Sequence, residues 1–458
     1  MVLEFTKAAR PSGPPLNVRP MVETGSDRWI RHGRVGVAAG GRHLAHADGT
    51  PFFYLADTAW NGVLLSSEPD WKTYLADRAA KGFTAIQFII MAPWAAAYID
   101  AEGRTAFAAD DPAKINPEFF HRIDARIQAI NDAGLLAVPV LAWAAKFGDS
   151  ARHNPGVSLG ANHLESLVRF QVDRYAKHHV LWLLAGDGNY GGWRSWKWKR
   201  IGRSVFGRRT EPRIPVGLHP MGMTWPYGSF CREPWLDLLG YQSSHSTDPR
   251  TLRWLLTGAP AKKWQTDARP ILNLEPCYEG IHNGAVNQAM TNVEVRRAMY
   301  ASLLNAPTAG VSYGAHGVWS WETQPREPLN HSGTGVARPW HEAMQFPGSF
   351  DVRRIASLFL SIDWWRLRPA QALLRAQPGT GDPNRFISIA ATPERDLALA
   401  YLPRGGEIML DFADGMAFSG EWFDPRTGER CRAESHSNRT FSAPDDEDWA
   451  LLLRRISV

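Results

Sequence analysis

The stretch Val180–Tyr190 (VLWLLAGDGNY) decides how the rest of the chain is interpreted. Its first six residues are all apolar, which is typical of a parallel strand that is covered on both faces. The apolar run then closes at Asp187, and Asn189 follows, so polar side chains stand at the carboxyl end of the predicted strand. A buried apolar strand that ends in a carboxylate is typical of an α/β fold whose active or binding site lies at the carboxyl ends of its strands.

The same pattern occurs eight times between residues 52 and 313. Amphipathic stretches between the runs, such as Glu68–Lys81 and Pro117–Ala133, predict helices. We therefore predict an α/β fold, a (β/α)8 TIM barrel over residues 34–364, with a leading β-hairpin at Arg34–Ala47. An open doubly wound sheet is the alternative, but no G-x-G-x-x-G follows the first run. The predicted strands are Phe52–Ala56, Ala85–Met91, Leu135–Ala142, Val180–Ala185, Ile214–Leu218, Leu236–Tyr241, Ile271–Leu274 and Gly310–Tyr313.

The pattern changes after Pro369, where short apolar runs are separated by turn sequences such as Pro-Arg-Gly-Gly and Asp-Pro-Arg-Thr-Gly. These runs predict a small C-terminal antiparallel β-sandwich over residues 365–458. An apolar seam formed by Phe359, Trp364, Trp365 and Leu367 should bury against the barrel. Residues 1–33 begin with a proline-rich, aperiodic segment and are predicted to be an N-terminal arm.

Composition excludes several classes of protein. With 44% hydrophobic and 21% charged residues the chain is not globally disordered. Its longest apolar stretch, Phe83–Ile99, is interrupted by a glutamine and a proline, so it falls short of the ~20 clean residues of a membrane helix. No signal peptide is evident, and the three cysteines show no paired spacing, so we expect a cytoplasmic protein without a disulfide framework or zinc ribbon.

Two carboxylates stand out at the strand ends, where TIM barrels carry their active sites. Asp187 and Glu275 each close an apolar run, and a charge there is costly unless it is used or paired. A single such carboxylate has the alternative of a helix cap or salt-bridge partner. Paired carboxylates in a pocket rich in aromatic side chains are typical of glycoside hydrolysis, and the chain has 20 Trp.

Other polar and aromatic residues at the strand ends are candidate sugar-binding residues by position, with bracing of the barrel rim as the alternative for each. They are Asp57, Trp60, Gln87, Trp94, Trp143, Asn189, His219, Gln242, His245, Tyr278, Tyr313, His316 and Trp319.

The motifs PFFYLADTAW, RAAKGFTAIQ, LAGDGN, ILNLEPCYEG and YGAHGVWSW resemble the apiosidase-like glycoside hydrolases, glycoside hydrolase family 140. WWRLRPAQALL, YLPRGGEIMLDF and WFDPRTGE resemble the β-sandwich commonly attached to that domain, which is named for collagen binding. The resemblance runs from about residue 34 to the chain end. It implies a retaining pair with Asp187 as acid/base and Glu275 as nucleophile, in a family whose known members act on apiose linkages in pectin side chains. Gly188 departs from the pattern, which has a bulkier, often basic residue there.

A basic stretch follows the strand of Asp187. Residues 193–209 (WRSWKWKRIGRSVFGRR) contain seven basic residues and three Trp, with no acid. A solvated helix face, a subsite for an acidic glycan and a nucleic-acid surface are its three interpretations. The net charge of +5 over 458 residues is a weak argument for nucleic acid, so no nucleic-acid partner is predicted. No histidine pair has metal-ligand spacing, so neither a metal nor a cofactor is predicted.

Together these features predict a glycoside hydrolase that acts on an oligosaccharide or glycoside by a two-carboxylate, retaining mechanism. A furanoside of apiose or another pentose is the expected substrate. A pyranosidase, and a non-catalytic carbohydrate-binding barrel, are the alternatives. No membrane partner is expected, and the oligomeric state is left open.

Overall fold

The computed structural model describes residues 25–91, 99–108, 111, 114–145, 154–207, 213–283, 288–413, 416–437 and 439–456. Eight parallel strands form one sheet in the order β8-β7-β6-β5-β4-β13-β10-β9, and backbone hydrogen bonds from Asp237 and Leu238 to Val216 bring its two edges together. The result is a nearly closed barrel, which confirms the predicted (β/α)8 fold. The strands are β4 (Tyr54–Thr58), β5 (Ala85–Ile89), β6 (Leu136–Val140), β7 (Trp182–Gly188), β8 (Val216–Pro220), β9 (Leu239–Gln242), β10 (Ile271–Glu275) and β13 (Gly310–Tyr313).

Helices surround the barrel, and several begin at side chains that the sequence supplies for this purpose. The Asn116 side chain accepts a hydrogen bond from the Glu118 amide at the start of α4, and Thr291 and Glu294 form a capping box on α11. The longer helices are α3 (Glu68–Ala80), α4 (Pro117–Asp132), α6 (Ala161–Tyr175), α7 (Ser195–Phe206), α9 (Pro249–Thr257), α11 (Asn292–Leu304) and α13 (Pro347–Leu360). The short ones are α1 (Asp27–His32), α2 (Gly62–Leu65), α5 (Pro155–Ser158), α8 (Tyr227–Phe230), α10 (Ala259–Lys263) and α12 (Trp340–Ala343).

Across the described residues, no helix combines the length and apolar character that crossing a membrane requires.

The predicted leading hairpin is present as β1 (Val35–Val37) and β2 (Leu44–His46), and β3 (Pro51–Phe52) adds a third antiparallel strand. Arg34 donates hydrogen bonds to the carbonyls of residues 176–178, which precede β7. At the hairpin turn Gly41 has a positive φ of 76°, and a Cβ there would lie 2.7 Å from the Ala268 carbonyl oxygen, just before β10. The hairpin therefore covers the amino-terminal ends of the strands and leaves their carboxyl ends open.

The C-terminal region consists of two antiparallel sheets, as predicted. The larger has the order β14-β15-β16-β22-β18-β19 and the smaller β17-β21-β20. Their strands are β14 (Arg368–Pro369), β15 (Ser388–Ala391), β16 (Leu397–Leu402), β17 (Glu407–Met409), β18 (Ala417–Phe423), β19 (Arg430–Ala433), β20 (Ser435–Ser437), β21 (Thr440–Ser442) and β22 (Trp449–Ile456). Buried side chains between the sheets, among them Ile408, Trp422, Phe441 and Leu451, form the core of this sandwich.

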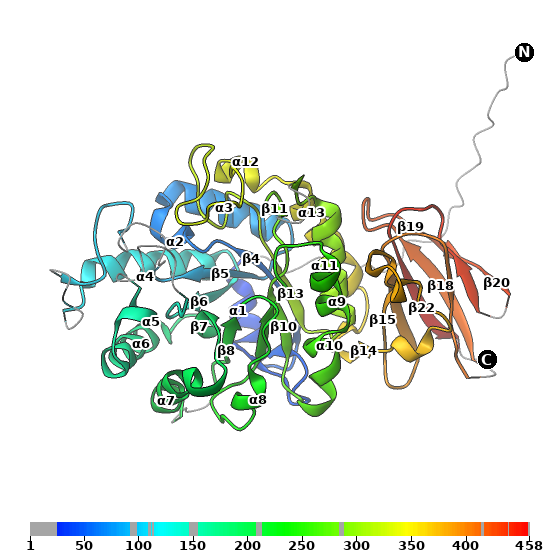
Figure 1. The fold of residues 1–458 in the computed structure, drawn as a ribbon, viewed down its shortest axis with the longest axis horizontal. Coiled ribbons are helices and arrows are strands. Elements are labelled where there is room, and N and C mark those ends of the chain that lie inside the picture. The colour runs from blue at the N-terminus through cyan, green and yellow to red at the C-terminus, as the bar shows by residue number, and fades with distance from the viewer. Residues whose placement is uncertain are drawn as a thin grey trace, which may run out of the picture.

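The sandwich packs directly on the barrel, on the side covered by α9, α11 and α13 (Figure 1). Tyr300 of α11 stacks on Tyr401 of β16, with ring centroids 4.3 Å apart and planes 4° from parallel. Phe359, Trp364 and Leu367 of the predicted seam are at most 1% exposed. One hydrophobic cluster runs from the barrel into the sandwich, so the two units share a core.

Candidate active site

Asp187 lies where the backbone of β7 departs from regular strand geometry. The pairing of β7 with β8 shifts register on both sides of it, between Leu183 and Gly186 and between Gly186 and Gly188. Its φ is 46°, a left-handed conformation that costs a residue with a Cβ on the order of 1 kcal/mol. Bulges of this kind re-aim side chains next to active sites.

The two glycines that flank Asp187 make room for aromatic rings. A Cβ on Gly186 would lie 2.2 Å from the Trp143 ring, and one on Gly188 would lie 2.0 Å from the Tyr190 ring. The Tyr190 side chain, which is fully buried, therefore occupies the space that a larger residue at position 188 would need.

Glu275 reaches the same place from the opposite side of the barrel. It is the last residue of β10, and the pairing of β10 with β9 also shifts register between Asn273 and Glu275. The Asn273 side chain accepts a hydrogen bond from the Glu275 amide. Both carboxylates thus stand at irregular strand ends, and their side chains are 19% and 8% exposed for Asp187 and Glu275.

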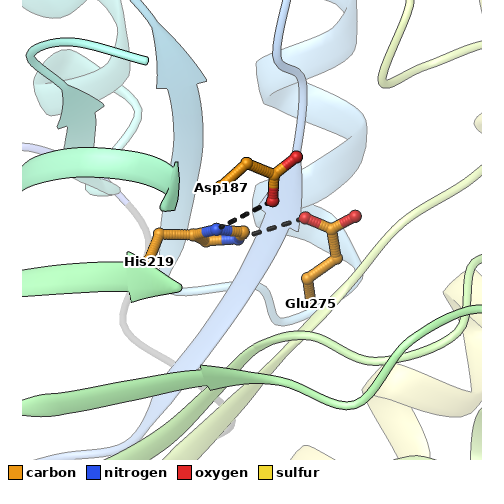
Figure 2. A group of neighbouring side chains, drawn as sticks. All are labelled: Asp187, His219 and Glu275. Atoms are coloured by element: carbon orange, nitrogen blue, oxygen red, sulfur yellow. Dashed lines mark ion pairs between the residues drawn. The ribbon is translucent and has the colours of Figure 1, made fainter. Parts of the chain in front are cut away.

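His219, at the end of β8, faces both carboxylates from one side (Figure 2). Its Nε2 is 3.1 Å from Glu275 Oε2, and its Nδ1 is 3.9 Å from Asp187 Oδ1. The imidazole is fully buried. One buried ring therefore touches the nearer carboxylate directly and faces the other.

His245 holds the second oxygen of Glu275. The backbone N–H of Tyr278 donates to His245 Nδ1 at 3.2 Å, so Nδ1 is an acceptor and the ring proton resides on Nε2. The Nε2 atom of His245 lies 2.8 Å from Glu275 Oε1. Each oxygen of Glu275 thus has one histidine partner, which fixes the orientation of the carboxylate.

The environments of the two carboxylates push their pKa values in opposite directions. Burial, together with the nearby charge of Glu275, raises the pKa of Asp187 to about 7. Burial alone would raise the pKa of Glu275 as well, but the hydrogen bonds of His219 and His245, together with the charge of His219, outweigh it and hold that pKa well below its usual range. Glu275 is therefore ionised at neutral pH, whereas Asp187 holds its proton to a higher pH than an ordinary aspartate does. Such a split assigns one carboxyl group as proton donor and the other as base or nucleophile.

Aromatic rings line the cluster. Trp60 meets the His219 ring edge-on at 5.3 Å, and Trp143 lies 5.8 Å from the same ring. Tyr278 packs against His245 with centroids 4.5 Å apart, and the Gln242 amide lies 3.4 Å from Asp187 Oδ1. Of the sequence-predicted site residues, the structure therefore gathers these four around the two carboxylates and their two histidines.

Trp319 lies one step further out, in the segment after β13. Its indole N–H donates to His316 Nδ1 at 3.1 Å, while His316 Nε2 lies 2.9 Å from the Gly335 carbonyl. Both ring nitrogens of His316 are therefore occupied in bracing the loop, and its predicted sugar contact has no free ring atom. His331 packs against Trp319 with centroids 4.9 Å apart.

The sequence did not identify His331 as a site residue. Burial lowers the pKa of His331, and the charges of Glu275 and His245 also act on that pKa. It stands 18 residues beyond Tyr313, the last residue of β13, in a loop with no periodic pattern. In the sequence, only the length of the loop after Tyr313 indicated that this segment could contribute a residue to the site.

Asp57 and Tyr313 require a correction, because their side chains point to the outer face of the barrel. Asp57 is fully buried and accepts hydrogen bonds from Tyr74 and Arg78 of α3. Tyr313 pairs with Asp57 in strand register and donates to Glu279 Oε2 at 2.6 Å. Successive residues of a strand alternate between faces, so the last residue of a run need not enter the barrel mouth.

Gln87 points into the barrel interior but is fully engaged there. It accepts from the Tyr54 hydroxyl and donates to Thr58 Oγ1 and the Leu274 carbonyl. Asn189 is exposed at the rim, and its side chain accepts from the Gly191 amide. Trp94 lies outside the described residues.

A metal ion is the other ligand that this cluster could hold. Among the described residues, Asp187, His219 and Glu275 form the one group whose donor atoms are close enough, all within 4.8 Å of one another. The two ring nitrogens of His219 lie 3.1 Å from Glu275 Oε2 (Nε2) and 3.9 Å from Asp187 Oδ1 (Nδ1). The absence of a metal stays a prediction.

Most of the basic side chains after β7 are committed to protein partners. Lys197 donates to the Gly156 and Leu159 carbonyls, Arg203 pairs with Glu233, and Arg200 contacts Asn162. Arg194 and Lys199 differ, since each lies 5.3 Å from the centroid of an aromatic ring, Trp193 and Phe230 respectively. The described part of the segment is therefore largely a braced helix, α7.

Two family models match the chain. Residues 38–366 match "Apiosidase-like, catalytic domain", and residues 369–454 match "Putative collagen-binding domain of a collagenase". No curated protein sequence matches it.

Solved structures share the fold. One titled "Glycoside hydrolase" has a TM-score of 0.79 at 20% identity and covers 93% of this chain and 97% of its own. A glycoside hydrolase family 5 structure from Bacteroides vulgatus has a TM-score of 0.79 at 19% identity, covering 93% and 94%. A family 5 mannosidase from Rhizomucor miehei in complex with mannosyl-fructose has a TM-score of 0.50 at 11% identity, covering 72% and 97%.

Proposed function

Since the chain belongs to the apiosidase-like family and is a glycoside hydrolase, we propose that it cleaves a pentofuranoside, such as an apioside, with retention of configuration. Asp187 is the acid/base and Glu275 the nucleophile in this proposal.

The observation that carries the proposal is the closeness of the two carboxylates. Oxygen atoms of Asp187 and Glu275 lie within 4.8 Å of each other. Retaining glycosidases hold their carboxyl groups about 5–5.5 Å apart, whereas inverting ones leave about 6.5–9.5 Å for a water molecule. The short separation favours direct attack on the sugar by one carboxylate.

The first half-reaction follows from the two pKa values. Protonated Asp187 donates its proton to the glycosidic oxygen as the bond to the anomeric carbon breaks. Ionised Glu275, oriented by His219 and His245, attacks that carbon and forms a glycosyl ester. The leaving group departs as an alcohol.

In the second half-reaction Asp187, now ionised, takes a proton from water. The resulting hydroxide-like oxygen attacks the anomeric carbon and releases Glu275 as a carboxylate. Trp60, Trp143 and Tyr278 line this position with apolar surface. The identity of the sugar ring is supported by family membership, and the two-carboxylate geometry serves a furanoside or a pyranoside equally.

A panel of aryl glycosides that includes apiofuranosides, arabinofuranosides and the common pyranosides tests the sugar. We expect turnover of a furanoside, with the first-formed product in the substrate's anomeric configuration by NMR. Turnover of pyranosides alone would overturn the furanoside assignment, and an inverted product would overturn the retaining mechanism.

Chemical rescue tests the roles. Azide should partly restore cleavage of an activated aryl glycoside by Asp187→Ala and give a glycosyl azide, because the acid is dispensable for an activated leaving group. It should not restore Glu275→Gln in this way. Sugar binding without turnover of any glycoside would instead favour a non-catalytic carbohydrate-binding barrel.

A further inference from the structure

Asn273 lies two residues before Glu275 in β10, and its side chain points away from the barrel mouth. It is 1% exposed, and its Nδ2 lies 2.9 Å from the Oγ of Ser302 in α11, which packs against β13 from outside the barrel (Figure 1). Residues two apart in a regular strand share a face, so a regular β10 would turn Glu275 outward as well. Glu275 is instead held by His219 and His245 in the mouth. The strand therefore turns over between residues 273 and 275, where its pairing with β9 shifts register.

The Asn273 side chain stabilises this turned-over strand end. Its Oδ1 accepts a hydrogen bond from the Glu275 backbone N–H at 3.3 Å. A shift of register interrupts the regular ladder of backbone bonds, and a buried amide left without an acceptor costs about 1–3 kcal/mol. Asparagine is suited to this position because its short side chain bonds to the backbone two residues on.

The same amide group also holds the segment that carries His245. Asn273 Nδ2 donates to the Oγ of Ser243 at 3.0 Å, and Ser243 directly follows β9, two residues before His245. The backbone N–H of Ser243 donates in turn to the Glu275 carbonyl at 3.0 Å. One buried side chain therefore joins the strand end of Glu275 to the strand end of its histidine partner.

Ser302 anchors this group to α11. Its hydroxyl donates to the Ala298 carbonyl one turn earlier in the helix at 2.6 Å, so it meets Asn273 as an acceptor. The amide of Asn273 thus uses its oxygen and both of its hydrogens, and a flipped amide would set N–H against the N–H of Glu275. A buried polar network whose members are all bonded makes its surroundings rigid.

We propose that Asn273 is a positioning residue for the attack of Glu275 on the anomeric carbon. It holds the strand end in the irregular conformation that presents Glu275 to the mouth, and it fixes the adjoining segment from which His245 reaches the same carboxylate. A nucleophile displaced by about 1 Å reacts about 10²-fold more slowly, so this support contributes to the rate although Asn273 does not contact the sugar. The inference rests on the proposed function, in which Glu275 is the nucleophile.

Steady-state kinetics of full-length Asn273→Ala on an aryl glycoside that wild type cleaves test the proposal. We expect kcat to fall about 10²-fold with KM nearly unchanged, because the variant loses the placement of the nucleophile and no contact to the bound substrate.

Asn305→Ala is the matched control. Asn305 is a buried asparagine at the C-terminal end of the same helix, α11, and its side chain bonds to Ser388 and Gln371. Its loss should lower the melting temperature and leave kcat at the wild-type value. Wild-type kcat in Asn273→Ala, or equal losses of kcat in the two variants, would overturn the proposal.

Trapping of the nucleophile separates this inference from the proposed function. A fluorinated, activated glycoside of the cleaved sugar forms a long-lived ester with the nucleophile, which mass spectrometry locates. We expect the ester on Glu275 in wild type and in Asn273→Ala, formed about 10²-fold more slowly in the variant. Equal rates would overturn the positioning role alone. An ester on another residue of wild type would overturn the proposed function and this inference with it.

Ser243→Ala keeps the test decisive if Asn273→Ala fails to fold. It removes one bond of the network and leaves the bond to the Glu275 amide in place. We expect a smaller loss of kcat in the same direction, again with KM unchanged. Wild-type kcat in folded Ser243→Ala would then overturn the proposal.

Discussion

The barrel mouth and the barrel–sandwich interface both bury carboxylates, but the carboxylates have different partners in the two places. At the interface Arg296 bonds to Asp351 and twice to Asp448, each at 2.7 Å, and the Tyr401 hydroxyl adds a further bond to Asp448. At the mouth Asp187 has a glutamine amide at 3.4 Å and a histidine at 3.9 Å.

This difference separates a structural carboxylate from a chemical one. Close cationic partners compensate the burial of a carboxylate and fix the packing around it, whereas a buried carboxylate with only distant partners bears the desolvation cost of its charged form. The interface therefore stabilises one arrangement of two domains. The mouth keeps a proton on Asp187 near neutral pH, in the position where a glycosidase needs a donor.

The largest effect should come from the mouth. Glu275→Gln should lower kcat at least about 10⁴-fold, because a carboxamide cannot act as the nucleophile, and Asp187→Asn about 10²–10⁴-fold. Glu279→Gln is the matched control, since Glu279 is buried near Glu275 but bonds to Tyr313 and the Gly348 amide. Steady-state kinetics on an aryl glycoside measure all three. Activity near wild type in Glu275→Gln would remove that residue from the chemistry.

At the interface the loss should appear in stability and not in turnover. Arg296→Met leaves Asp351 and Asp448 buried without their cation, which should cost about 3–5 kcal/mol of unfolding free energy. Arg297→Met removes one hydrogen bond to Asn384 from the next position of α11 and should cost about 1 kcal/mol. Denaturant titration compares the two. Equal losses of unfolding free energy would mean that the buried ion pairs of Arg296 stabilise the protein no more than the single hydrogen bond of Arg297.

His219 is the residue through which the mouth sets the pKa of Glu275. Replacing it in His219→Gln removes a partner that lowers this pKa, so the acidic limb of the kcat/KM profile should move to higher pH by about one unit. His316→Gln should leave that limb in place, because His316 bonds to Trp319 and Gly335. An unmoved acidic limb in His219→Gln would show that His245 alone keeps Glu275 ionised.

The smallest effect concerns stability against pH at the mouth. The pKa of folded Asp187 is raised from 3.8 to about 7, so the folded state holds a proton that the unfolded chain releases, and wild-type stability should fall as pH rises through this window. Asp187→Asn has no carboxyl group to titrate at this position. Its melting temperature should therefore rise relative to that of wild type as pH is raised from 4 to 7.

A capping aspartate provides the control of opposite sign. The pKa of Asp248 is lowered to about 2 by its hydrogen bonds with Thr251 and Ser246, so its contribution is present above pH 4 and is lost only below it. Asp248→Ala should therefore be less stable than wild type by a constant amount between pH 4 and pH 7. Parallel curves for Asp187→Asn and wild type would contradict a raised pKa at Asp187.

Much of this fold could be predicted because its signals are local. Apolar runs such as Ile271–Leu274 predict covered strands, and caps such as Asn116 with Pro117 mark where helices begin. The sandwich was predicted from turn residues between short apolar runs, a pattern that the polar strands β19 and β20 and the three-residue strand β21, with its single buried Phe441, do not show.

The sequence by itself determined which carboxylates close buried apolar strands, and therefore which strand ends we propose as the site of the chemistry. Only the tertiary structure decided which side chains enter the mouth: bulges turn Asp187 and Glu275 inward, while alternation turns Asp57 outward to Arg78. It also placed His219 against both carboxylates and brought His331 from a distant loop to where the charge of Glu275 acts on it. Strand periodicity is a property of neighbouring residues, whereas a pKa depends on everything that folding brings within a few ångströms, and a single run of sequence does not contain that information.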